Sequence, residues 1–156
     1  MEKTLVIIKP DGVQRRLVGE IIARFEKKGL KIAGLKMMHI DKELAERHYG
    51  VHKGKKFYES LMLFISSSPV VVLALEGRNA IAIVRKMMGK TFGGDAEPGT
   101  LRGDFGVSNS FNLVHGSDSP EFAETELALF FKPSELPKYD LTDSAWVYDW
   151  SKGQPE

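Results

Sequence analysis

Apolar residues follow two different spacings along this chain, and each spacing predicts one kind of element. Continuous apolar runs rich in β-branched residues predict strands, at residues 4–8, 30–40, 70–75 and 111–114. Apolar residues three and four positions apart predict helices, at residues 18–28, 57–65, 80–88 and 120–130, with a shorter helix at 42–48. This alternation predicts an α+β sandwich in which helices cover one side of a single sheet.

Residues with turn and capping chemistry mark where these elements begin and end. Asp41 and Asn79 are expected to cap the helices that follow them. The second strand carries an expected irregularity at Ala33-Gly34. The sequence Lys-Pro-Asp-Gly after the first strand predicts a turn that leaves Lys9 as a lone cation at the strand end, and residues 90–106 are expected to form a long polar loop.

Length and composition indicate one soluble domain spanning residues 1–156. The chain is 42% apolar and 28% charged with a net charge of +1, so no global field would recruit nucleic acid or a membrane surface. It has no cysteine, which excludes disulfides and thiol nucleophiles. With no signal-peptide pattern and no bilayer-length apolar run, we expect a cytoplasmic protein that does not enter membranes.

The tail from residue 132 onward is expected to be loop-rich. It holds both tryptophans, Trp146 and Trp150, together with Tyr139 and Tyr148. So many aromatic residues predict packing onto the body of the protein or onto a neighbouring subunit, whereas residues 151–156 are expected to be flexible.

The stretch from residue 112 to 119 reads Asn-Leu-Val-His-Gly-Ser-Asp-Ser and carries the strongest chemical signal. The preceding strand is expected to deliver His115 to its end, and Gly116 to turn the chain tightly. Ser119, followed by Pro and Glu, has the chemistry of a helix start. An imidazole beside the free amides of such a corner suits an anion, so we interpret His115 as a phosphate-accepting nucleophile.

Three cations would have to converge on this histidine for such chemistry. Lys9 ends the first strand, Arg85 lies in the last turn of a helix, and Arg102 falls in the expected long loop. A lone Lys or Arg is ordinarily a solvated surface charge. Convergence matters because positioning and electrostatics supply most of the rate of phosphoryl transfer.

The chain resembles the nucleoside diphosphate kinase family along nearly its whole length. The matching segments occur in the family's order, at residues 4–13, 19–22, 48–49, 69–71, 85, 88–91, 98–105 and 112–119. The longest are Pro-Gly-Thr-Leu-Arg-Gly-Asp-Phe, from residue 98, and the segment around His115. Spacing alone would have supported only an anion site with a nucleophilic histidine.

The resemblance implies a fold, an assembly and a reaction. The fold would be α+β, a ferredoxin-like antiparallel four-stranded sheet with helices packed on it, assembled as a homo-oligomer, either a tetramer or a hexamer. The reaction would move the γ-phosphoryl group of a nucleoside triphosphate, usually ATP, to a nucleoside diphosphate by a ping-pong route, maintaining nucleotide pools. His115 would carry the group as a phosphohistidine.

The resemblance also assigns roles to the residues that match the family's motifs. Arg85, Thr91 and Arg102 would bind the phosphates. Lys9 would contact phosphate and ribose, and Asn112 the ribose 3′-hydroxyl. Phe57 would stack on the base, Glu126 would orient the imidazole, and Tyr49 and Ser117 would support the histidine. Mg²⁺ would be carried by the nucleotide phosphates, and Asp118 could contact it through water.

The chain departs from the family's pattern at several positions. The family commonly has Gly-Arg where this chain has Ser110-Phe111, and a small apolar residue where it has Asn109. Gly93 replaces a proline often found in a subunit-contact loop, and Ser68 replaces a glycine. The first two changes concern the base slot, and Gly93 concerns the oligomer.

Other interpretations compete with this one. Residues 102–107 faintly imitate an RNA-recognition strand motif, so an RNA-binding ferredoxin-like domain is an alternative, although the low net charge argues against it and no specific nucleic acid partner is expected. An inactive scaffold that kept the fold is another alternative.

Two motif-like patterns in the sequence do not support a site. The Gly-Lys-Thr at residue 89 ends a helix instead of starting one, unlike a P-loop. His48 and His52 have metal-ligand spacing, but Gly50 between them makes a metal site there improbable.

Overall fold

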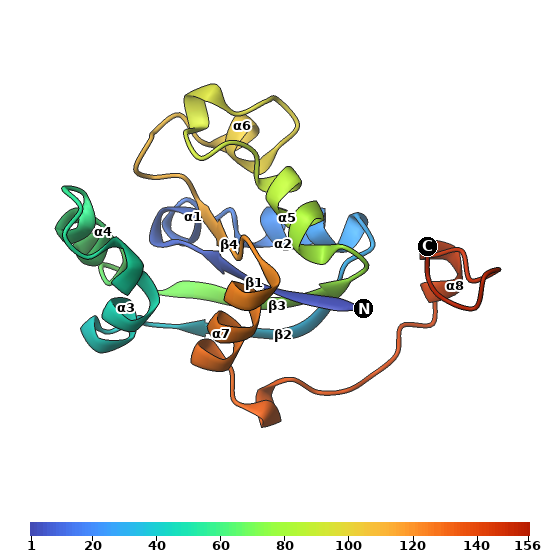
Figure 1. Cartoon of the computed structure of the whole chain (residues 1–156). Helices are drawn as coiled ribbons and strands as arrows, with labels where there is room; N and C mark the ends of the chain where they lie inside the picture. The colour runs from blue at the N-terminus through green and yellow to red at the C-terminus, as the bar shows by residue number, and fades with distance from the viewer.

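The computed structural model describes residues 1–156, and its centre is one antiparallel sheet of four strands. The strands are β1 (Glu2–Ile8), β2 (Lys31–Met38), β3 (Val70–Gly77) and β4 (Val114–Gly116), in the order β2-β3-β1-β4 (Figure 1). Both neighbours of β1 pair with it antiparallel, so the apolar first strand lies inside the sheet. The predicted α+β ferredoxin-like sheet is confirmed.

Eight α-helices and three short 3-10 turns complete the fold. Their bounds are α1 (Pro10–Gln14), α2 (Val18–Lys27), α3 (Lys42–Tyr49), η1 (Gly50–His52), α4 (Tyr58–Ile65), α5 (Ala80–Met88), η2 (Gly93–Asp95), α6 (Leu101–Phe105), α7 (Pro120–Phe130), η3 (Pro133–Glu135) and α8 (Ser144–Val147). None of the helices combines the length and the apolar character that crossing a membrane requires.

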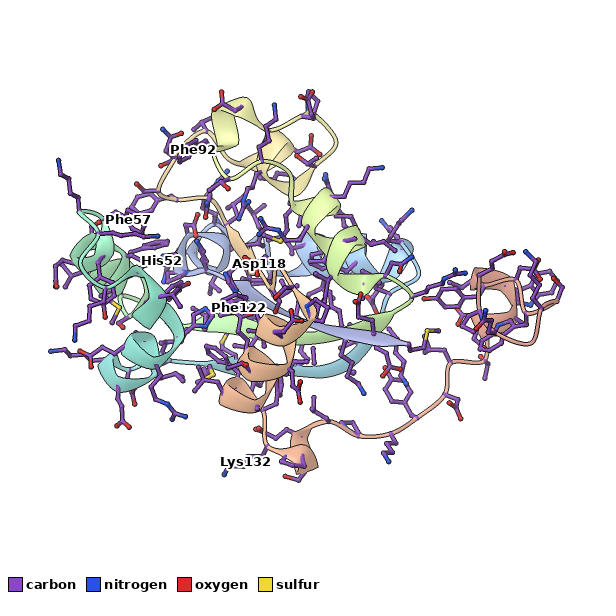
Figure 2. The ribbon with its side chains drawn as sticks, in the orientation of Figure 1. His52, Phe57, Phe92, Asp118, Phe122 and Lys132 are labelled. Carbon is purple, nitrogen blue, oxygen red and sulfur yellow. The ribbon has the colours of Figure 1, made fainter.

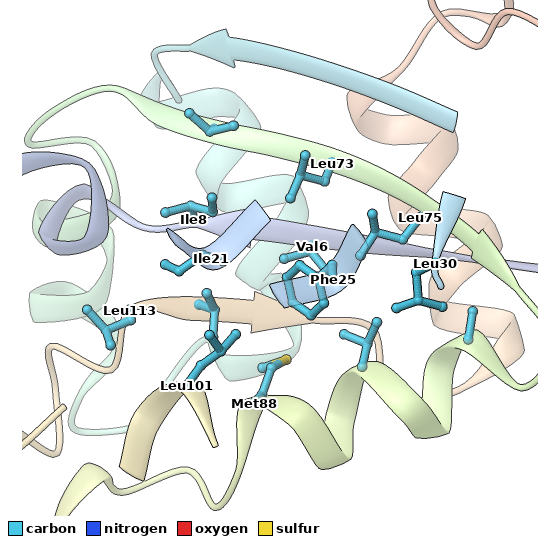
Figure 3. Close-up of a cluster of buried hydrophobic side chains, with 14 residues drawn as sticks. Val6, Ile8, Ile21, Phe25, Leu30, Leu73, Leu75, Met88, Leu101 and Leu113 are labelled. Atoms are coloured by element: carbon cyan, nitrogen blue, oxygen red, sulfur yellow. The ribbon is translucent and has the colours of Figure 1, made fainter. Parts of the chain in front are cut away.

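Helices cover both faces of the sheet, so the expectation of helices on one side only is wrong. In the view of Figure 1, α2 and α5 lie above the sheet and α7 lies below it. Val6 and Ile8 of β1 pack with α2, α5 and α6 in one core (Figure 3), whereas Leu5 and Ile7 pack with α3, α4 and α7 in another. The cause is visible in the sequence, since a strand that is apolar at every position must be buried on both faces.

The predicted helix cap at Asp41 is confirmed, whereas the one at Asn79 is wrong. The Asp41 carboxylate accepts a hydrogen bond from the Leu44 amide at 2.8 Å and caps α3, as predicted. Asn79 precedes α5 but has left-handed backbone (φ 52°) and makes no capping bond. The carboxylate of Glu2 takes that role, accepting a hydrogen bond from the Ile81 amide at 2.8 Å. A cap supplied from another part of the chain leaves no local sequence signal.

The predicted irregularity in β2 is confirmed, but two predicted non-helical segments contain short helices. The register against β3 shifts between Ile32 and Gly34. Pro10 begins α1 instead of continuing a turn, because proline is tolerated at the first position of a helix. The expected loop at residues 90–106 contains η2 and α6, and Thr100 caps α6 by accepting a hydrogen bond from the Gly103 amide at 3.0 Å.

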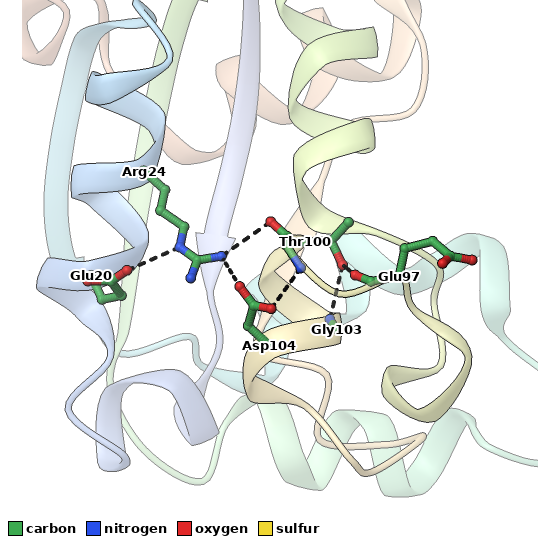
Figure 4. Close-up of polar contacts among 7 residues, drawn as sticks. Glu20, Arg24, Glu97, Thr100, Gly103 and Asp104 are labelled. Carbon is green, nitrogen blue, oxygen red and sulfur yellow. Dashed lines mark hydrogen bonds and ion pairs between the residues drawn. The ribbon is translucent and has the colours of Figure 1, made fainter.

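Polar contacts fix α6 against α2 (Figure 4). Arg24 of α2 forms an ion pair with Asp104 at 2.6 Å, and the same carboxylate accepts a hydrogen bond from the Gly99 amide at 2.7 Å. The hydrogen bond from the Gly99 amide holds the pKa of Asp104 below its usual range, and the contact with Arg24 lowers it further. The segment predicted to be a long polar loop is therefore anchored to α2 through Asp104 of α6.

The strand that carries His115 begins later than predicted. Leu113 has a positive φ of 70°, so β4 starts at Val114 and His115 lies in its middle, opposite Ile7. Gly116 lies in the strand and makes no tight turn. A side chain there would place its Cβ 2.6 Å from the sulfur of Met88, so close packing explains the glycine.

The tail runs from α7 to α8, which lies near the N-terminus in Figure 1. A Cβ added at Gly29 would lie 2.7 Å from Val147, and the Tyr148 hydroxyl accepts a hydrogen bond from the Arg78 amide at 3.3 Å. Trp146 is 92% exposed. The tail therefore packs on the body through Val147 and Tyr148, and Trp146 takes no part in that packing.

Candidate active site

All three predicted cations form hydrogen bonds with the segment of residues 112–116, which carries His115. The ammonium of Lys9 donates to the side-chain oxygen of Asn112 at 2.8 Å. The guanidinium of Arg102 donates to the carbonyl oxygens of Asn112 at 3.1 Å and Val114 at 2.7 Å. Arg85 donates to the carbonyl oxygen of Gly116 at 3.4 Å. Positive charge from three separate elements is thus gathered around one histidine.

The imidazole of His115 is held at one ring nitrogen. Its Nε2 lies 2.9 Å from the Oε1 of Glu126, and the side chain keeps 23% of its surface exposed. The second carboxylate oxygen of Glu126 accepts a hydrogen bond from the Ser117 hydroxyl at 2.5 Å. These contacts are the geometric basis for the predicted orienting role of Glu126, and they place Ser117 on the same carboxylate as His115.

The Glu126 carboxylate is buried yet ionised. Burial alone would raise its pKa, but the hydrogen bond and charge of His115 and the hydrogen bond from Ser117 outweigh burial and hold the pKa below its usual range. A carboxylate can only accept, so the proton of a neutral His115 ring lies on Nε2 and the lone pair lies on Nδ1.

Lys9 and Arg102 are both buried, which is rare for cations, and the charge of Asp11 acts on both of them. Burial, with the charge of Arg102 as the next cause, lowers the pKa of Lys9 to about 8. Burial and the charge of Arg85 lower the pKa of Arg102 to about 10. Two buried cations beside the exposed Arg85 form an environment that favours a multivalent anion.

The structure corrects the predicted position of Arg102. This residue lies on α6, not in a loop, and it also donates to the Gly89 carbonyl at 3.2 Å. Its contacts with residues 89, 112 and 114 tie the end of α5 to the His115 segment. Arg102 therefore has a structural role that its sequence context did not predict.

Asn112 and Thr91 meet beside Lys9. The side-chain amide of Asn112 donates to the Thr91 carbonyl at 2.9 Å, which brings the loop after α5 to the site. Sequence reasoning missed Asp11, whose carboxylate accepts a hydrogen bond from the Leu113 amide at 3.0 Å and supports the positive φ there. The Asp-Gly pair at this position suggested only a turn.

A series of aromatic rings connects Phe57 to His115. Phe57, which is 49% exposed, meets the ring of His52 edge-on at 5.4 Å between centroids (Figure 2). His52 stacks on Tyr49 at 6.3 Å, and the Tyr49 ring lies 6.3 Å from that of His115. Phe57 thus presents an exposed face near the site, as base stacking requires, and Tyr49 lies beside the histidine.

The unusual Phe111 packs outside this series. Its ring lies 4.8 Å from that of Phe64 and is 53% exposed, and Asn109 is exposed on the same connection. Neither residue is a hydrogen-bond partner of Lys9, Arg85 or Arg102.

His48 is a site residue that sequence reasoning did not assign. Its side chain is only 1% exposed, and its ring meets that of His115 edge-on at 4.7 Å. Burial, and then the charge of His115, lower its pKa to about 3, so it is neutral at physiological pH. In the sequence His48 lies close to His52, and nothing local indicates that its ring contacts His115.

The amides after His115 are less available than the sequence suggested. The Ser117 amide donates to the Leu5 carbonyl at 3.1 Å, so it is not free to bind an anion. The Ser119 hydroxyl caps α7 as predicted, accepting from the Phe122 amide at 3.2 Å. Asp118 is exposed (Figure 2). It lines a surface hollow together with Arg85 and Pro120.

Comparison with known proteins gives one consistent family. Residues 2–136 match the model of the family described as nucleoside diphosphate kinase. The chain is 58% identical to a nucleoside diphosphate kinase of Pelotomaculum thermopropionicum, over 96% of this chain and 100% of the relative, and 58% identical to one of Pyrococcus furiosus, over 95% and 93%. A structure of a halophilic nucleoside diphosphate kinase from Halobacterium salinarum in complex with CDP superposes with a TM-score of 0.93 at 50% identity, covering 95% of this chain and 99% of that one.

Proposed function

Because this chain belongs to the nucleoside diphosphate kinase family, we propose that His115 is the residue on which the enzyme carries the phosphoryl group. The enzyme transfers the γ-phosphoryl group of a nucleoside triphosphate to a nucleoside diphosphate by the ping-pong, phosphohistidine mechanism general to this family. The observation that carries the assignment to His115 is that Lys9, Arg85 and Arg102 all form hydrogen bonds with the five-residue segment around it.

The first half-reaction follows from the orientation of the ring. Glu126 holds the proton on Nε2, so the Nδ1 lone pair attacks the γ-phosphorus of the triphosphate. The bond between that phosphorus and the β,γ-bridging oxygen breaks, and its electrons leave with the nucleoside diphosphate. In the second half-reaction a terminal oxygen of another diphosphate attacks the phosphohistidine, and Nδ1 leaves as the neutral ring.

Glu126 has a second task in these steps. As Nδ1 bonds to phosphorus the ring acquires positive charge, and the adjacent carboxylate stabilises it without taking the proton. The Ser117 hydroxyl keeps the carboxylate from rotating because it occupies the other oxygen. We assign both residues as positioning residues for His115.

The cations stabilise the charge of the transferring group. We propose that Arg85, Arg102 and Thr91 bind the phosphates, with Lys9 shared between phosphate and ribose and Asn112 on the ribose 3′-hydroxyl. Phe57 would stack on the base, and stacking reads no base edge, which fits an enzyme that accepts many bases. The supporting position of Tyr49 beside the ring completes the set.

Mg²⁺ fits this site as an ion that arrives with the nucleotide. Mg²⁺ takes oxygen ligands and keeps several waters, so it needs few protein carboxylates when phosphates supply the rest. Asp118 is an exposed carboxylate in the hollow that Arg85 also lines, which suits contact through water. When bound, the ion would neutralise phosphate charge.

We further propose a homo-oligomer, tetramer or hexamer, working in the cytoplasm. The exposed Leu35 and Met37 lie on the edge strand β2, where apolar side chains would be covered by a neighbouring subunit. Light scattering after size exclusion tests the assembly.

One experiment tests the assignment of His115. The protein is incubated with γ-labelled ATP and Mg²⁺ and separated from nucleotide, and it should carry an acid-labile, alkali-stable label. Adding a nucleoside diphosphate should remove that label as labelled triphosphate. A folded His115→Ala variant should carry none, and label that survives in this variant would refute the assignment.

A further inference from the structure

The buried ring of His48 has no hydrogen-bond partner at either nitrogen. Buried polar groups are almost always paired, because leaving one unpaired costs free energy. The ring lies among Tyr49, Phe130 and His115, meeting each of them edge-on. Its Nδ1 lies 3.7 Å from Oε1 of Glu126, too far for a hydrogen bond, and a neutral ring forms no ion pair there.

His48, His115 and Glu126 together present three ligand atoms from three different elements. One ligand atom from each residue lies within 4.8 Å of the other two. Tetrahedral Zn²⁺ with bonds of about 2.0–2.1 Å requires ligand atoms roughly 3.4 Å apart. The distances of 2.9 Å from Glu126 to His115 and 3.7 Å from Glu126 to His48 lie on either side of that value.

We propose that these three side chains form a binding site for a Zn²⁺-like transition-metal ion, and that the bound ion prevents His115 from accepting a phosphoryl group. Two imidazoles and one carboxylate, with a fourth position open to water, is a ligand set suited to zinc. Mg²⁺ favours oxygen ligands and would not compete for two imidazoles. The exposed side of His115 leaves a path for the ion and its fourth ligand.

The competition follows from the tautomer of His115. The ion would take the Nε2 lone pair, so the ring proton must move from Nε2 to Nδ1 through solvent, with no net gain or loss of protons. Nδ1 then carries a hydrogen and has no lone pair to attack phosphorus. This consequence rests on the proposed function of His115, whereas the binding of the ion does not.

The rest of the chain offers no similar group. The chain has four histidines and no cysteine, and the only cluster of three metal-ligating residues is the one described above. His39 is exposed on the connection before α3, and His52 faces Tyr49 and Lys55. One high-affinity transition-metal site per chain is therefore expected.

Binding is tested first without nucleotide. The full-length protein is titrated with Zn²⁺ by calorimetry and with Co²⁺ by visible absorption, which reports tetrahedral coordination. The test variant His48→Phe keeps an aromatic ring against Tyr49 and Phe130, and His39→Phe is the matched control. Glu126→Gln is the second test variant, and circular dichroism confirms that each variant is folded.

The expected result is one ion per chain in the wild type and in His39→Phe, with affinity lower by about tenfold or more in His48→Phe and Glu126→Gln. Wild-type affinity in both folded test variants, or no binding by the wild type, would overturn the proposal. If one test variant does not fold, the other decides.

Competition is tested by loading the protein with one equivalent of Zn²⁺, removing free ion, and measuring the initial rate of labelling from γ-labelled ATP with Mg²⁺. Zn²⁺ should slow labelling of the wild type about tenfold or more, and a chelator should restore it. Labelling that Zn²⁺ does not slow would overturn the inhibitory part alone. A failure of the metal-free protein to label at all would instead refute the proposed function.

Discussion

The Nε2 of His115 and the Oε1 of Glu126 lie 2.9 Å apart, and this pair determines which nitrogen of the ring is nucleophilic. Glu126 comes from α7, while His115 comes from the middle of β4. Because α7 packs against β1 and β4 pairs with β1, the two residues are held in a fixed relation by the core. The fold itself therefore orients the imidazole.

Removing the Glu126 carboxylate should slow phosphoryl transfer without abolishing it. Glu126→Ala frees the ring to rotate and change tautomer, and loss of such an orienting partner lowers activity by about 10- to 100-fold. The rate of labelling from γ-labelled ATP measures the effect. Glu124→Ala, an exposed position on the same helix, serves as the control and should label at the wild-type rate. An unchanged rate in Glu126→Ala would argue against the orienting role.

Arg102 and Arg85 should differ in their effect on stability. Arg102→Met removes a buried guanidinium and the hydrogen bonds that it donates to three carbonyl groups, so the free energy of unfolding should fall by about 3 kcal/mol or more. Arg85 is exposed with one long hydrogen bond, and Arg85→Met should change stability by only about 0.5 kcal/mol. Urea denaturation measures both.

Both arginine variants should nevertheless lose activity, by about 100-fold or more in kcat/KM, because each removes a cation that stabilises the transferring group. Equal stability of the two variants would contradict the structural role of Arg102. Full activity of Arg85→Met would contradict its place in the phosphate site.

The pH dependence of activity should report the buried Lys9. Its ammonium must be charged to bind phosphate, and burial has lowered its pKa to about 8 in the protein without nucleotide. As the pH rises through about 8 the charge is lost, so kcat/KM should fall on the alkaline side. Bound phosphates favour the charged form, so kcat at saturating nucleotide should fall only at higher pH.

A Lys9→Met variant provides the control for this profile. It should have a lower kcat/KM at neutral pH and should lack the decline above pH of about 8. If the variant keeps the same alkaline decline, the titrating group is not Lys9.

Phe57 should contribute to binding of every base alike. Stacking on an aromatic ring contributes about 1–3 kcal/mol, so Phe57→Ala should raise KM roughly 5- to 150-fold for purine and pyrimidine diphosphates together. Leu63→Ala, at an exposed position of α4, the helix that follows Phe57, is the control and should leave KM unchanged. A loss confined to one class of base would indicate recognition by another group.

The sequence predicts β1, β2, β3 and the longer helices because their apolar residues form local runs or recur at helical spacing, whereas β4 begins later than the apolar run at residues 111–114 indicates. The Ala33-Gly34 pair, and not the apolar spacing, indicates the irregularity that the structure has between Ile32 and Gly34. The unbroken apolar run of β1 indicates burial on both faces, but it does not indicate which helices cover each face, because Leu5 and Val6 look equally apolar whichever helix they face. That assignment depends on packing between distant segments.

The features missed in the site depend on contacts between residues far apart in sequence. Arg102 looked like a loop cation because nothing local predicts its bonds to residues 112 and 114. His48 looked like half of an improbable pair with His52, although its neighbours in space are His115 and Glu126. The local sequence indicates His115 and the three cations as candidates, whereas the roles of Phe57, Thr91 and Asn112 come only from the resemblance to a family.

The most direct test of the account is the position of the phosphoryl group on the isolated phosphoprotein. ³¹P NMR of the enzyme labelled with ATP distinguishes phosphate on the two ring nitrogens of histidine, and peptide mapping identifies the residue. We predict a single phosphohistidine at His115 with phosphorus on Nδ1. Phosphate on Nε2 of His115, or on any other residue, would contradict the claim that Glu126 leaves Nδ1 free to carry the group.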